Sequence, residues 1–278
     1  MSIAVRVTIN PESGQHPLLQ LLLAARNHEA SILAGDDEAV HQYRVNLRQL
    51  RALIGLLARL QPALRLDPIG KGIKQLMRAT ADDRDRAVAL SLLRQRHAPA
   101  ELAGLATTSC DRARLGQWLT SSDYQHQCEQ LQALLALLPP LPARHRWAKG
   151  CARNGRKLSR ACRQLRTDSA PTELHQLRIA IKKLRYRLEL LGKAPKSAQA
   201  TLAELRQWQK LLGELHDQAV VVALLLNSDG SSVGQPLLLQ ELQRLEQQRQ
   251  QAITSLKASS LAKADGKRWR RRLRRWSP

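Results

Sequence analysis

A pattern of basic residues at helical spacing occurs twice in this chain, and this duplication constrains the fold more than any other feature. Residues 41–51 read HQYRVNLRQLR, and residues 175–185, which begin 134 positions later, read HQLRIAIKKLR. Two further matches occur in the same order: 84–88 (RDRAV) with 216–220 (HDQAV), and 25–27 (ARN) with 152–154 (ARN). A duplicated helical unit of about 130 residues explains all three matches.

The chain is predicted to be all-α. Apolar residues recur at three- and four-residue steps, and clusters of Pro, Gly, Ser and Asp interrupt them, which predicts roughly eight to ten helices. Aromatic residues make up 3% of the chain and Phe is absent, so the composition is poor in strand-forming residues. Residues 3–9 (IAVRVTI) alternate in polarity and could form one short strand or an ordered leader.

Each copy of the repeated pattern carries an apolar row and a basic row on one helix. The apolar rows are predicted to face the core, and their members step by three or four: Tyr43, Leu47, Leu50, Ile54 and Leu57, and then Leu174, Leu177, Ile181, Leu184 and Leu188. The basic rows are His41, Arg44, Arg48 and Arg51, and then His175, Arg178, Lys182 and Arg185. Each basic row lies about 100° from its apolar row, so it borders the packed face.

The two basic rows have no acidic residues among them. Asp and Glu are absent from residues 41–60 and from residues 174–188. A solvated helix face usually mixes signs, because like charges one turn apart repel each other. The whole chain carries 45 Lys and Arg against 23 Asp and Glu, a net charge of +22. This excess indicates a polyanionic partner: nucleic acid, an anionic membrane surface or a phosphate polymer.

Two shorter basic series flank these rows. The first contains Lys149, Arg153, Arg156, Arg160 and Arg163, with Lys157 alongside, and the second contains Lys71, Lys74 and Arg78. A solvated face explains either series as well as a ligand does. If these helices pack beside the basic rows, the series would line the same groove.

Several other classes of function receive no support. The chain has no Walker loop, no metal-ligating set of carboxylates and no nucleophile constellation, so we expect a binding protein and not an enzyme. The arginines near His41 and His175 would repel a cation, so neither a metal site nor a cofactor is expected. Asp85 and Asp217 are interpreted as structural residues that cap helices or hold arginines.

The cysteines and the hydropathy pattern indicate a cytoplasmic protein. The cysteines show no CxxC pair or zinc-like spacing, so they are interpreted as reduced and mostly buried thiols: Cys110, Cys128, Cys151 and Cys162. The N-terminus lacks the apolar stretch of a signal peptide. The longest apolar run, 219–226, is too short to cross a bilayer.

The C-terminal segment is strongly basic. Residues 267–276 read KRWRRRLRRW, and Trp269, Leu273 and Trp276 would share one face of a helix. Such a helix fits an interfacial membrane helix, a nucleic-acid-binding arm or a segment that adheres to polyphosphate. A disordered, solvated tail is an equally good interpretation.

The repeated motif resembles that of the CHAD family, the conserved histidine α-helical domain. The copies read H-x-x-R-V-x-x-R-x-x-R and H-x-x-R-I-x-x-K-K-x-R-Y, each followed by an R/H-D-x-A-V segment interpreted as a turn, and the resemblance covers residues 16–262. It implies two sequence-related four-helix units packed pseudo-symmetrically around a basic central groove or pore. The implied organisation is a CHAD domain over 1–263, with repeats 16–139 and 140–262 and a basic tail over 264–278. The chain carries no ExExK signature of an accompanying triphosphatase domain.

The resemblance also implies binding of inorganic polyphosphate and association with polyphosphate granules. Sulfate or phosphate could mimic the polymer. The residues that look like ligand contacts are His41, Arg44, Arg48 and Arg51, then His175, Arg178, Lys182, Lys183 and Arg185, with Arg26, Lys74, Arg78, Arg153 and Lys157 as further basic positions. The oligomeric state is left open.

Two alternatives to polyphosphate binding stay open. Backbone-directed binding of nucleic acid is the first, because phosphate contacts dominate that affinity. Single-strand binders use stacking aromatic residues, and this chain has only five Trp and three Tyr. The second and weaker alternative is a phosphate-processing enzyme.

Overall fold

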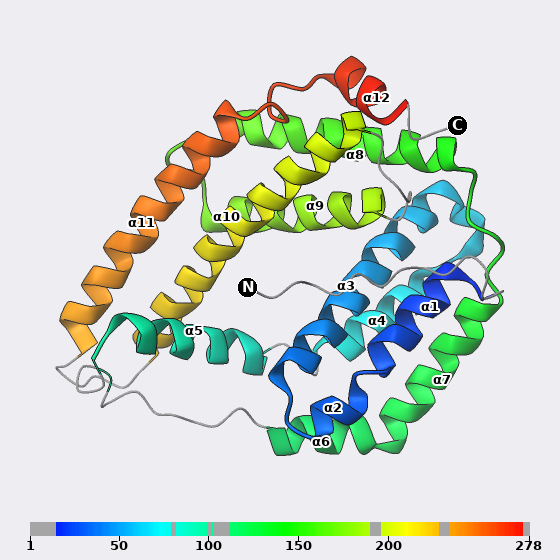
Figure 1. The fold of residues 1–278 in the computed structure, drawn as a ribbon, viewed down its shortest axis with the longest axis horizontal. Helices are drawn as coiled ribbons and strands as arrows, with labels where there is room; N and C mark the ends of the chain where they lie inside the picture. The colour runs from blue at the N-terminus through cyan, green and yellow to red at the C-terminus, as the bar shows by residue number, and fades with distance from the viewer. Residues whose placement is uncertain are drawn as a thin grey trace. The chain divides into compact units, whose positions relative to one another are not determined.

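The computed structural model describes residues 15–78, 82–98, 102, 112–189, 196–227 and 234–274. Over these ranges the chain is all-α, as predicted, and contains no strand (Figure 1). The strand or leader predicted at residues 3–9 lies outside them. The chain forms two compact units, of which unit 1 comprises residues 1–82 and 111–143, and unit 2 comprises residues 83–110 and 144–278.

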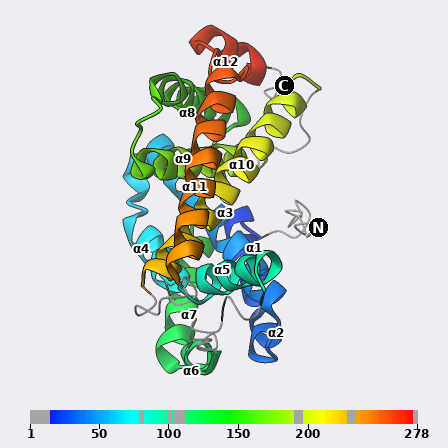
Figure 2. The same cartoon turned by 90° about the vertical axis from the view of Figure 1, so that its left-hand side faces the viewer.

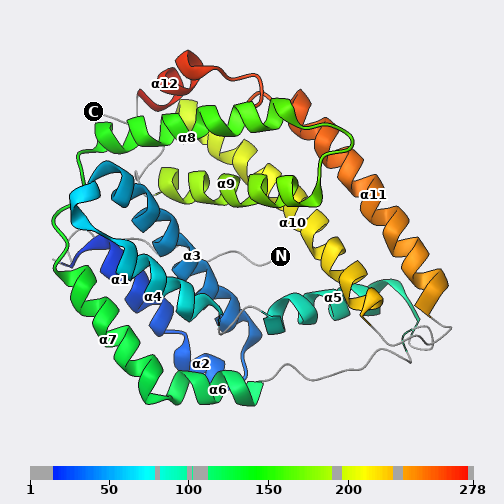
Figure 3. The same ribbon diagram turned by 180° about the vertical axis from the view of Figure 1, so that it is seen from behind.

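Unit 1 is built around a long helix, α3, which packs against α1, α2 and α4 (Figure 3). Its helices are α1 (Pro17–Arg26), α2 (Glu29–Leu33), α3 (Asp37–Leu60), α4 (Asp67–Arg78), α6 (Arg112–Thr120) and α7 (Ser122–Ala136). Side-chain caps fix three of their starts, since His16, Asp36 and Ser121 accept hydrogen bonds from the backbone N–H groups of Leu18, Glu38 and Tyr124.

The predicted apolar row of α3 forms the core of unit 1. Tyr43, Leu47, Leu50, Ile54 and Leu57 are all buried. The hydroxyl of Tyr43 lies 3.3 Å from that of Tyr124 on α7, and Tyr124 donates a hydrogen bond to Glu29 on α2. These polar contacts satisfy hydroxyl groups that burial removes from water.

Unit 2 contains the remaining helices. They are α5 (Asp82–Arg96, apart from its first residue), α8 (Arg144–Gln164), α9 (Pro171–Glu189), α10 (Lys196–Leu226), α11 (Gly234–Ala258) and α12 (Gly266–Arg274). Helix α9 packs against both α8 and α10, and α10 packs against α11 (Figure 2). The second predicted apolar row is buried in this core: Leu174, Leu177, Ile181, Leu184 and Leu188. Both core-facing rows are therefore confirmed.

Helix α5 belongs to unit 2, although it falls within the first sequence repeat. Its Ala89 and Leu93 form one apolar cluster with Val221, Leu225 and Leu237 of α10 and α11. At its C-terminal end, Arg96 Nη1 lies 3.1 Å and His97 Nε2 lies 2.8 Å from the buried carboxylate of Glu241. The compact units and the predicted repeats therefore differ in the assignment of this helix.

One sequence interpretation differs from the structure, and one alternative within another is excluded. The R/H-D-x-A-V segments are not turns, since residues 84–88 lie inside α5 and residues 216–220 lie inside α10. In α10 the helix continues because buried residues keep their helical spacing through the motif: Leu205, Trp208, Leu212, Leu215, Gln218, Val222 and Leu225. Asp217 is therefore interior to a helix and does not cap one.

The basic C-terminal segment is ordered over residues 266–274. Helix α12 packs on α8, and its apolar residues Trp269 and Leu273 are fully buried there. Trp269 Nε1 donates a hydrogen bond to Ser159 Oγ at 2.7 Å. This segment is thus an integral part of unit 2 and not a solvated tail. Trp276 lies outside the described residues.

Candidate functional site

The second basic row runs along α9 beside its buried apolar row. His175 and Lys183 are exposed, and Arg178, Lys182 and Arg185 are half-buried. The row from His175 to Arg185 extends about 15 Å along the helix axis. The basic row lies beside the apolar row because each of its residues follows a core residue by one position, and such residues flank the packed face of a helix.

A cavity of about 160 Å³ opens beside the first part of this row. Helices α9, α10 and α11 all contribute to it. Its basic lining comes from His175, Arg178, His216 and Arg249, and its apolar lining from Pro171, Leu174, Leu212, Leu215, Ala219 and Leu245. The rings of His175 and His216 lie with their centroids 5.6 Å apart. The structure thus brings together a predicted histidine, a predicted arginine and two basic residues from other helices.

Arg249 is held by a neighbouring carboxylate. Its Nε and Nη2 donate to the two oxygens of Glu246 at 2.7 and 2.8 Å, and its Nη1 donates to the carbonyl of Ser169 at 3.0 Å. The hydrogen bonds to Glu246 raise the pKa of Arg249 and lower that of Glu246. This pair fixes Arg249 at the cavity wall and compensates its charge.

Two of the predicted contact residues also pair with carboxylates. Arg185 Nη1 lies 2.9 and 3.0 Å from the two oxygens of Glu189, and its Nε donates to Gln209 at 2.7 Å. Arg26 donates to Glu29 at 2.9 Å and to Gln125 at 2.8 Å. The segment without acidic residues ends at residue 188. Glu189 is the next residue, and its carboxylate compensates the charge of Arg185.

The first basic row lies on α3 in unit 1. Arg44 is buried with 8% of its surface exposed, His41 and Arg48 are half-buried, and Arg51 is exposed. Burial of Arg44 agrees with the prediction that the row borders the packed face. Lys74 and Arg78 are exposed on α4, which packs against α3.

The two remaining predicted residues, Arg153 and Lys157, are exposed on α8 and do not line the cavity. Conversely, His216 and Arg249 line the cavity but were not among the predicted contacts. His216 could have been found, since it stands in the HDQAV copy of the second repeat. Arg249 lies on α11, which has no counterpart in the repeated motifs, so the sequence offered no signal for it.

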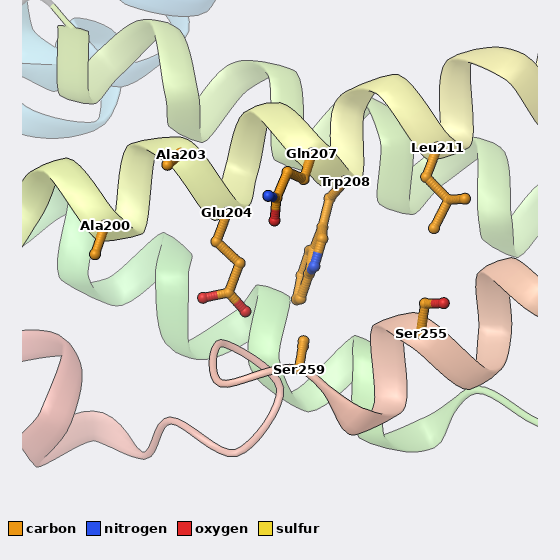
Figure 4. A pocket seen from close by; sticks show the side chains of 8 residues that line it. All are labelled: Ala200, Ala203, Glu204, Gln207, Trp208, Leu211, Ser255 and Ser259. Carbon is orange, nitrogen blue, oxygen red and sulfur yellow. The ribbon is translucent and has the colours of Figure 1, made fainter.

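A second cavity lies between α10 and α11 (Figure 4). Its lining is neutral or acidic: Ala200, Ala203, Glu204, Gln207, Trp208, Leu211, Ser255 and Ser259. The Glu204 carboxylate accepts hydrogen bonds from Ser260 Oγ at 2.6 Å and from the backbone N–H of Leu261 at 3.0 Å. Because its lining includes a carboxylate and no basic residue, this cavity does not suit a polyanion.

The described residues provide neither a cluster of metal ligands nor a membrane-spanning helix. They contain no group of three or more His, Cys, Asp or Glu side chains placed to hold a metal ion. Within the same ranges, no helix combines the length and the apolar character needed to cross a membrane.

Comparison with known proteins gives the chain a family. The model of the CHAD domain matches residues 18–226, and a search of curated proteins found no match. Among solved structures, the chain is similar to the crystal structure of the CHAD domain from the plant Ricinus communis. The two share 25% sequence identity with a TM-score of 0.65, over 93% of this chain and 89% of the plant chain. Because the matched region includes both basic rows and most of the chain, the protein belongs to the CHAD domain family.

Proposed function

We propose that this protein binds inorganic polyphosphate, without catalysing a reaction on it, and that the α9 row and its cavity make the principal contacts. The observation that carries the proposal is the convergence of His175, Arg178 and His216 from two helices on one cavity, from which Lys182 continues the row along α9. Arginine forks bind phosphate oxygens in a bidentate manner, and lysine adds a mobile point charge. An extended row suits a linear chain of phosphates better than a single phosphate.

The α3 row of unit 1 is proposed as a second contact region for the same polymer. Its Arg48 is half-buried and its Arg51 is exposed, so both guanidinium groups are accessible to a phosphate chain. Family membership supports this function, since the CHAD resemblance implies polyphosphate binding. The shared groove and the association with polyphosphate granules stay predictions.

A competition assay at fixed salt tests the proposal. Fluorescently labelled long-chain polyphosphate is bound to the protein and then displaced by unlabelled polyphosphate, double-stranded DNA or single-stranded RNA. We expect polyphosphate to displace the probe at the lowest phosphate concentration. The variant Arg48→Gln/Arg178→Gln/Lys182→Gln should lose at least about 1,000-fold in polyphosphate affinity, because each of the three charge-assisted contacts contributes about 1.5–3 kcal/mol.

A matched variant separates specific contacts from net charge. The variant Arg59→Gln/Arg94→Gln/Lys210→Gln also removes three positive charges, but from exposed positions outside the two basic rows. It should lose less than about threefold in affinity, because exposed charges at a distance are screened by salt. Equal losses in the two variants would refute the site. Phosphate release in the presence of Mg²⁺ or Mn²⁺ would refute the non-catalytic role.

A further inference from the structure

Helix α12 joins α8 to form one continuous basic surface on unit 2. The two helices pack side by side (Figure 1). Trp269 of α12 is fully buried over Gly155 of α8, and its indole N–H bonds Ser159. At the edge of this contact the side chain of Arg156 touches Gly266, the first residue of α12. Arg156 therefore lies where the two helices meet.

The surface carries only positive charge on its two helices. Neither α8 nor α12 contains an Asp or Glu. The exposed basic residues are Arg146, Lys149, Arg153, Arg156, Lys157, Arg160 and Arg163 on α8, and Lys267, Arg268, Arg270 and Arg271 on α12. Asp265 precedes α12, and its carboxylate accepts a hydrogen bond from the backbone N–H of Arg268 at 2.7 Å. That carboxylate serves as a helix cap.

This surface is separate from the cavity on α9. None of the residues that line the cavity comes from α8 or α12. The CHAD family match ends at residue 226, so α12 lies outside the matched residues. Its charge therefore needs an explanation of its own.

The burial pattern decides which polyanion fits. Interfacial membrane helices insert apolar residues, but Trp269 and Leu273 of α12 are already buried inside unit 2. Proteins that bind single strands stack bases on aromatic rings, but Trp147 and Trp269, the aromatic residues of these two helices, are both buried. The exposed side chains of α8 and α12 that could contact a ligand are basic, and basic side chains bind the phosphates of a nucleic-acid backbone.

The width of the surface favours a double-stranded polymer. The row from Lys149 to Arg163 extends about 21 Å along α8. Helices in contact lie about 8–10 Å apart, a separation between the widths of the minor and major grooves of DNA, about 6 and 12 Å. Two adjacent basic helices can thus contact phosphates of both strands, whereas a single phosphate chain would follow one row. We infer that the α8–α12 surface binds the backbone of double-stranded nucleic acid without reading its sequence.

The test uses the full chain and a fluorescent duplex DNA of arbitrary sequence. The variant Lys267→Gln/Arg270→Gln/Arg271→Gln removes three exposed charges from α12 and leaves Trp269 in place. We expect at least a tenfold loss of duplex affinity. The slope of log affinity against log salt should fall by about three, since each lost phosphate contact removes about one counterion. Circular dichroism and the melting temperature should remain unchanged.

The variant Arg59→Gln/Arg94→Gln/Lys210→Gln again serves as the charge-matched control and should keep duplex affinity within about threefold. Equal losses in both variants would show that only net charge matters and would overturn the inference. Tighter binding of the intact chain to phosphatidylserine vesicles or single-stranded DNA than to the duplex would overturn it as well.

Polyphosphate binding distinguishes this inference from the proposed function. The α12 variant should bind polyphosphate within about threefold of the unchanged protein, while Arg48→Gln/Arg178→Gln/Lys182→Gln should keep its duplex affinity to the same degree. Loss of both ligands in the α12 variant would mean one shared surface and would refute two separate sites.

Discussion

The indole ring of Trp269 occupies the space that a side chain at Gly155 would need. A Cβ atom at position 155 would overlap the six-membered ring of the Trp269 indole. Glycine at this position of α8 thus permits the close approach of α12, and the buried indole N–H bonds Ser159. The packing of α12 on α8 therefore depends on a glycine that lies 114 positions before Trp269 in the sequence.

We expect Gly155→Ala to lower the free energy of unfolding by about 1–3 kcal/mol, because the added methyl group overpacks the contact with Trp269. Gly213→Ala is the matched control. It lies inside α10 with no atom within 4 Å of an added Cβ, so it should gain about 0.5–1 kcal/mol from helix propensity. Denaturant unfolding measures both. Equal effects of the two substitutions would contradict the packing of α12.

Glu241 should control the acid stability of unit 2. Burial alone would raise the pKa of this carboxyl, but hydrogen bonds from Gln218 and His97 and the charges of Arg244 and Arg96 lower it overall. A carboxyl whose pKa is lowered in the folded protein stabilises the fold at every pH above its unfolded-state pKa. This stabilisation is lost as the pH falls through the lowered pKa of the folded state. We expect Glu241→Gln to cost about 3–5 kcal/mol at neutral pH, since it breaks a buried charge cluster.

The difference between Glu241→Gln and the unchanged protein should shrink as the pH falls from about 5 through the lowered pKa of the folded state, because the carboxyl is protonated first in the unfolded chain and then in the folded protein as well. Urea unfolding at several pH values measures this. Glu246→Gln is the control, because its pair with Arg249 is partly exposed and should contribute less than about 1 kcal/mol. A pH-independent difference for Glu241→Gln would contradict the assignment.

The buried thiols should resist modification in the folded protein. Burial raises the pKa of Cys151 and of Cys162 to about 12, and it also raises the pKa of Cys128. Thiolates are the reactive species, so these groups should be inert near about pH 8. In a Cys110→Ser variant, an aromatic disulfide reagent should label no thiol rapidly until denaturant is added. Rapid labelling of the folded variant would contradict the burial of at least one of the three.

Arg178 and Arg185 should contribute unequally to polyphosphate binding. Arg178 lines the cavity, whereas Arg185 already forms two contacts with Glu189. A phosphate bound in the cavity would therefore touch Arg178 directly, whereas Arg185 lies outside the cavity lining. We expect Arg178→Gln to lower affinity about tenfold and Arg185→Gln less than about threefold. Fluorescence anisotropy measures both, and the opposite order would contradict the role of the cavity.

Much of the local structure could be predicted from the sequence. The apolar rows on α3 and α9 are buried as predicted, and the basic rows flank them, because helical periodicity fixes which residues share a face. The spacing of Trp269 and Leu273 likewise predicted an amphipathic helix. The interpretation of residues 216–220 as a turn was wrong. It depended on similarity between the two repeats, and the segment contains no helix-breaking residue.

Periodicity says which face of a helix is buried but not which other helix covers it. The sequence alone therefore determined the all-α class, the two basic rows and the apolar faces of the long helices. Only the tertiary structure decided that α5 packs with α10 and α11, that α12 covers Gly155, and that His216 and Arg249 reach the cavity beside Arg178. These contacts join residues far apart in the chain, and they depend on shape complementarity between packed surfaces, which no local pattern of residues encodes.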